Sequence, residues 1–579
     1  MGAMMMLEAA FTMFLTMLLT IPGMMLIIGA LAVPVLPLPA RNAYMLVLIA
    51  ISGWSVWHIS PDETMTATLA GIDLILVRGE AITKPFALVF HIAAALNVIY
   101  AMHENAKITA TAGLTYAGAA IAALFAGDFL TLFIYWELTT FASVFLVLAG
   151  DSSRAMRAAM RYLLMQVASG VILLAGAVLL WRAGAGFTIT ALDATTPAGF
   201  CILLAFGIKA GFPLLGGWLQ DAYPEASPTG SVMLSAFTTK LAIYMLVICF
   251  AGFKPLIYIG LAMAVIPLFA ALIENNLRRV LAIALVNQLG IMVVGIGIGS
   301  ELAVNGVTAH AFASVLYKGL LFMSIGAVFM RTGTDQADAL GGLSRQMPWT
   351  AAFCLIGALS IASMPLFSGF TTKALTIGAV AKQGELLVWL GLLFASVGVV
   401  LHTAVKLPYA TFFAPNDKIK AEEAPLNMRV AMALAAGGCI LIGLYPSALY
   451  ALLPYEVSYK VWDSGHVLGE LQLLAFAALI FALMVRRGIY PLHGARVVLY
   501  SDWLTRRVIP RIIIGLGEPL MKIWNALKDG SVALTLRALR TSEEASRATG
   551  LASGIASTGA AAGIFLAVFA LILLIRVLM

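Results

Sequence analysis

Long apolar segments separated by short polar joints follow one another along the whole chain. About sixteen of them are long enough to cross a hydrocarbon layer of roughly 30 Å, which takes about 20 helical residues. Their centres lie near residues 24, 50, 94, 117, 139, 170, 209, 240, 264, 289, 317, 367, 399, 439, 478 and 568. The joints are charged or rich in Gly and Pro, as in ENNLRR at 274–279. This pattern predicts an all-α protein that crosses a membrane many times.

The composition agrees with a polytopic membrane protein. Of the 579 residues, 62% are hydrophobic and 11% are charged, and the mean hydropathy is +0.99. The first apolar segment, near residues 9–37, is longer than the core of a signal peptide and lacks a basic leader, so we interpret it as a retained membrane helix. The cysteines lie far apart in apolar segments, which favours packing over a disulfide framework or a metal site. They are Cys201, Cys249, Cys354 and Cys439.

Basic residues gather in the joints that follow odd-numbered segments. They are Arg41, Lys107, Arg154, Arg157, Arg161, Arg278, Arg279, Arg331, Arg345, Lys418 and Lys420. By the positive-inside rule these joints are cytoplasmic, which predicts a multi-pass protein of the cell inner (plasma) membrane with its N-terminus outside. The acidic joint near residues 456–470 fits the opposite face. The net charge of +7 therefore reflects topology, and no basic patch with interleaved aromatic residues indicates nucleic acid.

Ionisable residues inside the predicted spans are the candidates for function. Each charge near the bilayer centre costs roughly 2.5–3.5 kcal/mol on insertion scales, so a chain that keeps several is expected to use them. The candidates are Glu137, Lys209, Lys240, His310, Lys318 and Lys373. Lys406 lies near the end of its span, where we expect its side chain to snorkel to the interface. For His91 and His402 we expect packing roles.

Two spans carry helix breakers beside their lysines. Lys209 precedes Pro213 in FGIKAGFPLLGGWLQDAYP, and Lys373 follows Pro365 and Gly369 in SMPLFSGFTTKAL. A broken helix frees backbone groups, which must be buried in protein or line a hydrated cavity, as at the ion sites of transporters. The occurrence of this pattern in two spans predicts an internal repeat.

A row of polar residues marks another span. His310, Ser314 and Lys318 are spaced i, i+4, i+8, so they share one helix face at intervals of about 6 Å. Such a row can hold ordered waters and pass protons. The alternative is that each residue makes a single hydrogen bond to a neighbouring helix.

Several long motifs resemble, in order, those of the proton-translocating antiporter-like family. They are LFIYWELTT, IKAGFPLLGGWLQDAYPEASPTGSVMLSAFTTKLAIY, IENNLRRVLAIALVNQLGIMVVGIG, HAFASVLYKGLLFMSIGAV and LGGLSRQMPWTAAFCLIGALSIASMPLFSGFTTK, within roughly residues 70–450. That family includes the A and D subunits of the Mrp-type sodium/proton antiporters and the large membrane-arm subunits of respiratory complex I. The chain looks most similar to the D subunits, partly because Lys373 follows SGFTT.

The resemblance implies roles for the six candidates. Glu137 matches the glutamate of the family's fifth helix, Lys209 the lysine of the first broken helix, and Lys240 the lysine that follows. His310 and Lys318 match the histidine and lysine of the eleventh helix. Lys373 matches the ionisable residue of the second broken helix.

The chain departs from the family pattern at two points. The segment LLGGWLQDAY lacks a loop histidine that the family often has, and Ser314 stands where a second histidine is frequent. Proton passage at these points needs water or another residue.

The resemblance also implies about 14 core helices with two inverted five-helix repeats, each with a broken helix. The expected parts are N-terminal transmembrane helices at 1–107, the two repeats at 108–252 and 253–413, C-terminal transmembrane helices at 414–490, a lateral segment at 491–555 and a final anchor at 556–579. The lateral segment alternates basic and apolar residues, which indicates an amphipathic helix on the cytoplasmic membrane face. It predicts a strap over a neighbouring subunit, and the alternative is a plain tether for the last span.

The implied function is a proton-translocating membrane subunit of a multisubunit monovalent cation (Na⁺)/proton antiporter. The chain would be part of an ion transporter and not an enzyme. Its partners would be other membrane subunits, the lipid bilayer, protons, and Na⁺ or K⁺. The sequence has no cofactor or metal motif, so we expect neither on this chain. Two alternatives stay open: a proton-pumping subunit of a complex I-like, redox-driven complex, and the membrane subunit of an inorganic-carbon pump.

The hypothesis for proton movement begins with Glu137 and Lys209. A desolvated lysine is a poor holder of its proton, whereas a nearby carboxylate restores it. Moving Glu137 toward or away from Lys209 would therefore load or unload a proton. The proton would pass to Lys240, then along the row of His310 and Lys318, and finally to Lys373.

Overall fold

The computed structural model describes residues 20–69, 71–416, 418–488 and 490, and in the C-terminal region residues 511, 514–515, 517–519, 521–530, 533 and 537. The chain divides into two units, Met1–Asp502 and Trp503–Met579. In the second unit, residues 521–530 form an exposed helix. The start of the first predicted span, most of the lateral segment and the final anchor lie outside the described residues.

The first unit is helical apart from one hairpin, which confirms the prediction of an all-α polytopic protein. Its elements are α2 (Met24–Gly29), η1 (Ala30–Val35), α3 (Leu38–Trp57), β1 (Thr64–Leu69), β2 (Ile72–Arg78), α4 (Thr83–Tyr100), α5 (Lys107–Phe125), α6 (Phe129–Leu148), α7 (Ser153–Arg182), α8 (Pro197–Ala210), α9 (Gly217–Ala222), η2 (Tyr223–Glu225), α10 (Pro228–Ala236), α11 (Thr238–Phe250), α12 (Pro255–Ile273), α13 (Leu277–Ile298), α14 (Glu301–Thr332), η3 (Leu343–Arg345), α15 (Pro348–Ile361), α16 (Ser368–Lys382), α17 (Leu386–Val399), η4 (Val400–Val405), α18 (Lys406–Pro408), η5 (Tyr409–Phe413), α19 (Leu426–Leu444), α20 (Pro446–Tyr450) and α21 (Ser464–Arg486).

The predicted spans centred between residues 24 and 478 each fall on a helix or on a pair of helix fragments. Of the described helices, 11 are long and apolar enough to cross a membrane. Several begin at a polar residue whose side chain accepts hydrogen bonds from the first turn, such as Asp128 before α6 and Ser152 before α7. The polar joints therefore set where the helices begin.

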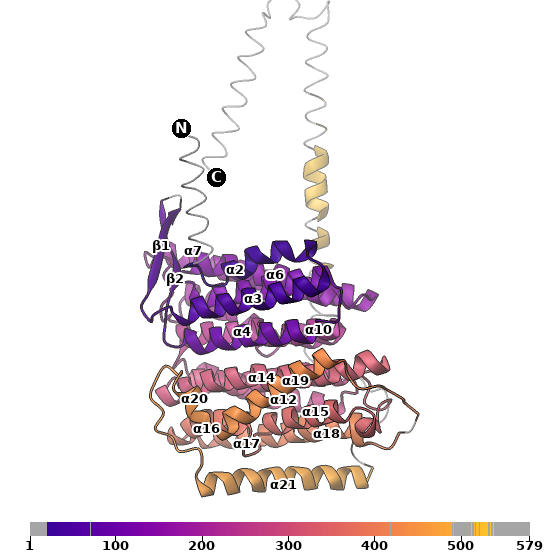
Figure 1. The fold of residues 1–579 in the computed structure, drawn as a ribbon. Helices are drawn as coiled ribbons and strands as arrows, with labels where there is room; N and C mark the ends of the chain where they lie inside the picture. The colour runs from indigo at the N-terminus through magenta and orange to yellow at the C-terminus, as the bar shows by residue number, and fades with distance from the viewer. Residues whose placement is uncertain are drawn as a thin grey trace, which may run out of the picture. The chain divides into compact units, whose positions relative to one another are not determined.

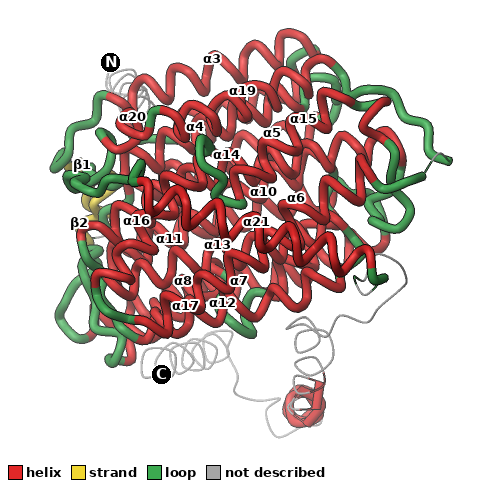
Figure 2. Tube along the Cα trace, turned by 90° about the horizontal axis from the view of Figure 1, so that it is seen from below, coloured by secondary structure: helices red, strands yellow, loops and turns green. Residues whose placement is uncertain are grey.

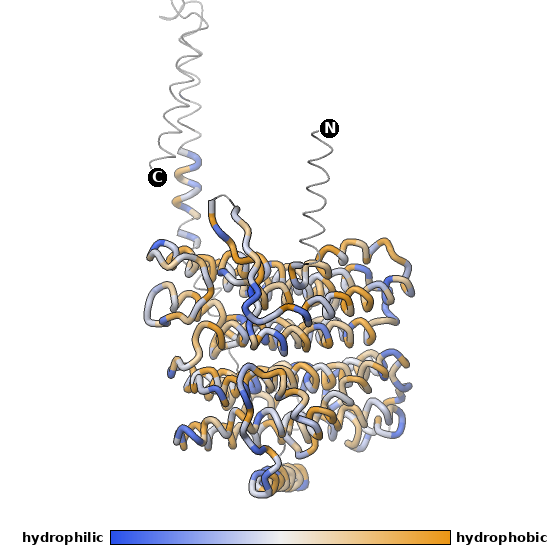
Figure 3. The backbone as a smooth tube through the Cα atoms, turned by 60° about the vertical axis from the view of Figure 1, so that its left-hand side comes forward, coloured by the Kyte–Doolittle hydropathy of each residue, from blue (hydrophilic) through white to orange (hydrophobic). Residues whose placement is uncertain are grey.

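The helices of the first unit run side by side in stacked layers (Figures 1 and 2). The centre is formed by α13 and α14, which are almost wholly buried, whereas α21 is mostly exposed and packs on α17 and η4. Most hydrophilic stretches lie at the helix ends and in the loops (Figure 3). Helices that are surrounded by other helices on all sides, such as α13 and α14, are expected to be mostly apolar around their whole circumference.

A β-hairpin was not anticipated from the sequence. Strands β1 and β2 pair antiparallel, with Thr64 opposite Arg78 and Gly71 at positive φ in the turn. The amide of Ile75 donates to the Asp128 carboxylate at 2.7 Å, and Arg78 donates to the Ile189 carbonyl at 2.7 Å. The hairpin is thus fastened to the loop before α6, a contact that hydropathy does not reveal.

Both predicted helix breaks are present. After α8 the chain passes through Gly211 and Leu214, both at positive φ, before α9 begins. Between α15 and α16 it passes through Ser363 and Leu366, also at positive φ. The Trp218 indole donates to the Ile208 carbonyl at 2.9 Å, so a group freed by the first break is satisfied inside the protein.

Two further interruptions were not predicted. Helices α10 and α11 are separated at Phe237, whose φ and ψ are −100° and −66°. The long helix that starts at Leu386 is wound as a π-helix at η4 and η5, on both sides of α18. Short π segments often occur at functional sites.

Candidate functional site

Lys209 lies in the last turn of α8 and is fully buried. Its Nζ donates to the Trp136 carbonyl at 2.8 Å, to Thr139 Oγ1 at 3.1 Å and to Thr140 Oγ1 at 3.2 Å. It also lies 4.3 Å from the centre of the Trp136 ring. All of these groups belong to α6 and are neutral. The Lys209 amine of α8 is therefore hydrogen-bonded to neutral groups of α6, and none of these hydrogen bonds is to a carboxylate.

Glu137 follows Trp136 on α6 but points to a different neighbour. Its Oε1 is buried without a hydrogen-bond partner among the described residues, and a Cβ built on Gly170 of α7 would overlap it. Within residues 20–69 and 71–416, no ion pair joins Glu137 to Lys209. Glu137 and Lys209 are nevertheless near enough to interact electrostatically, and the coupling between the acid and the amine stays a prediction.

Lys240 lies near the start of α11 and is fully buried. Its Nζ donates to the Ser235 carbonyl at 2.7 Å. In a continuous helix that carbonyl would accept from the amide of Thr239. The interruption at Phe237 releases it, and Lys240 takes the place of the missing backbone donor.

The polar row on α14 is buried but not continuous. His310 Nε2 lies 3.0 Å from Gln288 Oε1, and His310 Nδ1 lies 3.3 Å from Thr372 Oγ1 of α16. Ser314 donates to the carbonyl of Ala311 on its own helix at 2.9 Å, so it does not bridge to its neighbours. Lys318 Nζ reaches the Leu281 carbonyl of α13 at 3.4 Å. His310 therefore joins α13 and α16, while Lys318 is held by α13 alone.

Lys373 on α16 is buried and follows Thr372, the partner of His310. Glu470 of α21 is near enough to interact with it electrostatically. One turn before Glu470, the ring of His466 stacks on Phe370 with centroids 4.7 Å apart. The joint predicted near residues 456–470 includes Glu470, whereas α21 begins at Ser464. The i, i+4 spacing of a histidine and a glutamate was the available signal.

Lys406 corrects a sequence expectation. It does not snorkel but is fully buried, and its Nζ donates to the carbonyls of Ala271, Leu272 and Glu274 at 3.3, 2.8 and 2.7 Å. These are the unsatisfied carbonyls at the C-terminal end of α12, where a cation is favoured by the helix dipole. His402, also buried, lies 2.7 Å from Thr403 through Nδ1.

The helices that carry the predicted residues are neighbours in series. Lys209 joins α8 to α6, and α8 contacts α11, which contacts α14, which contacts α16. These five helices carry Glu137, Lys209, Lys240, His310, Lys318 and Lys373, all placed in one unit. The amines of Lys209, Lys240 and Lys318 and the imidazole of His310 are bonded to hydroxyl, amide and carbonyl groups of other elements. The arrangement brings several ionisable groups into one apolar interior, where each must be neutral or compensated.

A comparison with protein families identifies the central part of the chain. Residues 126–401 match the family described as "NADH:quinone oxidoreductase/Mrp antiporter, TM". The match includes all six candidate residues and both helix breaks, which confirms the resemblance found in the sequence motifs.

Curated relatives match about half of their own length. Hydrogenase-4 component B of Escherichia coli (strain K12) is 30% identical over 358 residues, which are 55% of this chain and 53% of that protein. The A subunit of the Na(+)/H(+) antiporter of Bacillus subtilis (strain 168) is 26% identical over 447 residues, 67% of this chain and 54% of that protein. The chain thus spans about half the length of these relatives.

Two solved structures share the fold. One is the Mrp complex from Dietzia sp., with a TM-score of 0.75 and 21% identity over 91% of this chain and 62% of that chain. The other is the membrane-bound sulfane sulfur reductase, an archaeal respiratory membrane complex, with a TM-score of 0.69 and 23% identity over 96% of this chain and 99% of that chain. At these identities the likeness concerns the fold.

Proposed function

Because residues 126–401 match the NADH:quinone oxidoreductase/Mrp antiporter transmembrane family, we propose that the chain is a proton-translocating membrane subunit of a multisubunit monovalent cation/proton antiporter. The observation that carries this proposal is the unbroken series of contacting helices α8, α11, α14 and α16, each of which holds a buried ionisable residue. Such residues are costly inside a membrane and are therefore expected to serve ion passage.

The proposed proton route follows that series. Protons are held at Lys209, pass to Lys240, reach the row of His310 and Lys318, and leave from Lys373. Glu137 controls the first step by swinging from Gly170 toward Lys209, which favours the charged amine, and back again. In this structure the Lys209 amine is hydrogen-bonded to Trp136, Thr139 and Thr140. These contacts support the state of the cycle in which the Glu137 carboxylate lies beside Gly170.

One gap in the route needs water. His310 and Lys318 are eight residues apart, about 12 Å along the helix axis. Ser314 between them is bonded to its own backbone, whereas the hydroxyl of Tyr317 donates to Gln288 Oε1 at 3.2 Å beside His310. We expect Tyr317 and Gln288, with water, to replace the histidine that the family often has at position 314.

Partners and topology complete the proposal. The chain would assemble with other membrane subunits, as the D subunits of Mrp antiporters do, in a plasma membrane with its N-terminus outside. Support for the topology comes from the clustering of basic joints at one end of the helices: Arg41 bonds to the loop of Glu104, and Arg331 bonds to the Glu423 carbonyl. The repeat boundaries at 108–252 and 253–413 remain predictions.

A redox-driven complex is the second candidate. It is favoured by the structure of the sulfane sulfur reductase chain, which this chain matches along 99% of its length, and by the likeness to hydrogenase-4 component B. In such a complex the same residues would move protons, but electron transfer on other subunits would drive them.

One experiment separates the candidates and tests the route. Proton flux is measured in everted vesicles from cells that express the complete complex, with the native chain, Glu137→Ala and Lys209→Ala. We expect flux driven by added Na⁺ or K⁺ that both substitutions abolish while the complex still assembles. Flux that requires an electron donor and ignores added cations would support the redox-driven candidate. Native flux in Lys209→Ala would contradict the route in either setting.

A further inference from the structure

A cavity outside the row of lysines lies where α3, α4, α5 and α10 meet. Its volume is about 40 Å³, and its lining includes Arg41, Asn97, Glu104, Gly113, Thr229 and Met233. A water needs a space of roughly 10–15 Å³, so the cavity can hold water. It opens at the joint between α4 and α5, which the positive-inside rule assigns to the cytoplasm.

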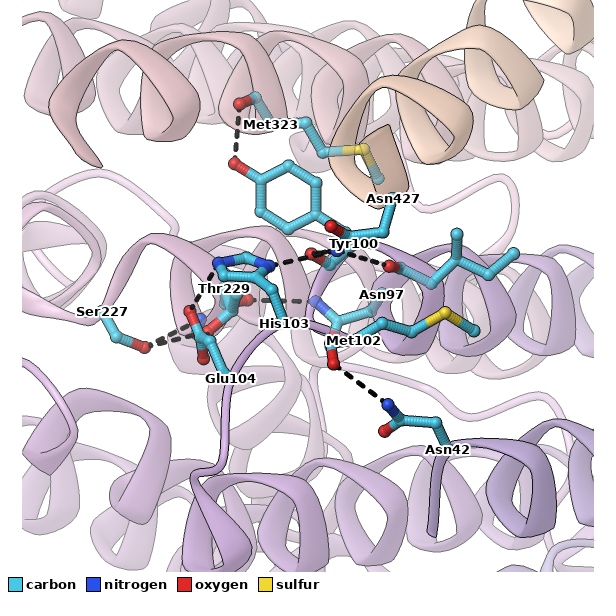
Figure 4. Close-up of polar contacts among 12 residues, drawn as sticks. Asn42, Asn97, Tyr100, Met102, His103, Glu104, Ser227, Thr229, Met323 and Asn427 are labelled. Carbon is cyan, nitrogen blue, oxygen red and sulfur yellow. Dashed lines mark hydrogen bonds and ion pairs between the residues drawn. The ribbon is translucent and has the colours of Figure 1, made fainter. Parts of the chain in front are cut away.

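Glu104 is the acidic residue of this cavity, and Figure 4 shows its surroundings. Its Oε2 accepts a hydrogen bond from Thr229 Oγ1 at 3.0 Å, its Oε1 lies 3.9 Å from His103 Nε2, and its carbonyl accepts from Arg41 at 2.9 Å. Burial raises the pKa of Glu104, against a smaller opposing effect of the Thr229 hydrogen bond and of His103. A carboxyl in this setting can take up a proton nearer to neutral pH than an exposed one.

The tautomer of His103 follows from its other neighbour. Asn427 Nδ2 donates to the carbonyls of Ile99 at 3.1 Å and Tyr100 at 2.9 Å, which fixes the orientation of this amide. The same Nδ2 lies 3.0 Å from His103 Nδ1, which must therefore accept. A neutral His103 then carries its proton on Nε2, the atom that faces Glu104 (Figure 4).

Inward from Glu104 the cavity follows α10. Thr229 and Met233, one turn apart on this helix, both line it, and the Met233 methyl lies 3.6 Å from where a Cβ on Gly113 of α5 would be. Ser235, whose carbonyl holds Lys240, is two residues further along the chain. Met233 and Gly113 therefore form an apolar constriction between the cavity and the neighbourhood of Lys240.

Polar groups resume beyond the constriction. Tyr116 is one turn after Gly113 on α5, and its hydroxyl lies 2.6 Å from Thr238 Oγ1 and accepts from the Thr238 amide at 3.0 Å. Thr238 begins α11, two residues before Lys240. The hydroxyl groups of Thr229, Tyr116 and Thr238 thus lie along the way from Glu104 to Lys240, with Met233 as the apolar interruption.

We propose that Glu104, with His103, is the proton-uptake site on the cytoplasmic side, and that its water-sized cavity delivers protons past Met233 to Lys240. This proposal rests on the proposed function, because it supplies the protons that the lysine row moves. Glu104 takes up a proton from the cytoplasmic side and releases it to water in the cavity, while neutral His103 keeps the Nε2 proton that faces the Glu104 carboxylate. No bond other than those to the proton changes.

The test compares two substitutions of different kinds. Glu104→Gln keeps the size of the side chain and an acceptor for Thr229 but cannot carry a proton, and Gly113→Leu fills the cavity without changing a charge. Proton flux is measured in everted vesicles of the complete complex and normalised to assembled protein. We expect each to lower the flux about tenfold or more, and Glu104→Asp to restore part of it, which a purely structural role would not predict.

Glu225→Gln is the matched control. Glu225 lies at the same end of the helices and pairs with Arg154 at 3.5 Å, but it does not line the cavity. We expect native flux in this variant. Native flux in assembled Glu104→Gln would overturn the proposal, and if that variant does not assemble, native flux in Gly113→Leu would do so.

The outcome is distinguishable from a failure of the proposed function. If Lys209→Ala abolishes flux while Glu104→Gln leaves it native, the uptake site is wrong and the lysine route stands. If Lys209→Ala leaves flux native, the route itself is wrong. Either result is read in the same vesicles.

Discussion

Gly170 of α7 faces the carboxylate of Glu137 of α6 so closely that any Cβ at this position would overlap Glu137 Oε1. Because residue 170 has no side chain, the Glu137 carboxylate fits against α7, whereas Lys209 is hydrogen-bonded to α6. The position beside Gly170 is one of the two that the proposed route requires of the Glu137 carboxylate, and the other lies toward Lys209.

Gly170→Ala should remove that place and force the carboxylate to rotate away from α7. Because the acid then loses one of its two positions, we expect the proton flux to fall about tenfold, which corresponds to about 1.4 kcal/mol. The measurement is flux per assembled complex in everted vesicles. Gly437→Ala on α19, where a new Cβ meets no atom within 4 Å, is the control and should retain native flux. Native flux in Gly170→Ala would show that Glu137 does not need this position.

Thr139→Val and Thr140→Val together should weaken the hold on the Lys209 amine. Each loses a hydroxyl acceptor at 3.1 or 3.2 Å from Nζ, and a hydrogen bond to a charged group contributes about 1.5–3 kcal/mol. We expect the double variant to assemble but to lose most of its proton flux. The double Ser variant keeps both hydroxyls and should remain close to native. Equal flux in the Val and Ser variants would remove the threonines from the route.

Trp218→Phe tests the first helix break. The indole donates to the Ile208 carbonyl at 2.9 Å, and this carbonyl also accepts from the Gly211 amide at 3.2 Å. The substitution therefore removes one of two hydrogen bonds, at a cost of about 0.5–1.5 kcal/mol. We expect a lower midpoint of thermal unfolding for the purified complex, measured by intrinsic fluorescence. Trp54→Phe changes an exposed tryptophan and should leave the midpoint unchanged. No difference between the two variants would mean that the Gly211 amide alone satisfies the Ile208 carbonyl.

Lys406→Met tests the correction at the end of α12. If Lys406 snorkelled, its replacement would be nearly neutral, whereas the buried lysine bonds to three carbonyls. We expect a loss of about 1–3 kcal/mol, seen as lower thermal stability or reduced assembly. Lys254→Met, at the exposed opposite end of α12, is the matched control and should be near native. Native stability in Lys406→Met would restore the snorkelling interpretation.

The sequence by itself determined the positions of the spans, because the length of an apolar segment is set by the bilayer and is read along the chain. It also located both helix breaks, since Pro213 and Pro365 lack the backbone amide that a regular helix needs. The buried charges were identifiable for the same local reason: a lysine in an apolar run is conspicuous whatever its neighbours are.

Only the tertiary structure decided which groups those charges meet. The partner of a buried polar group belongs to another helix, and periodicity along one helix carries no information about which face of which neighbour lies opposite it. For this reason only the structure shows that Glu137 packs against Gly170, that Lys406 is bound to the end of α12, and that Glu104 lies in a cavity shared with α10. The sequence determines which helix carries each buried charge, and the packing of the helices determines which groups that charge contacts.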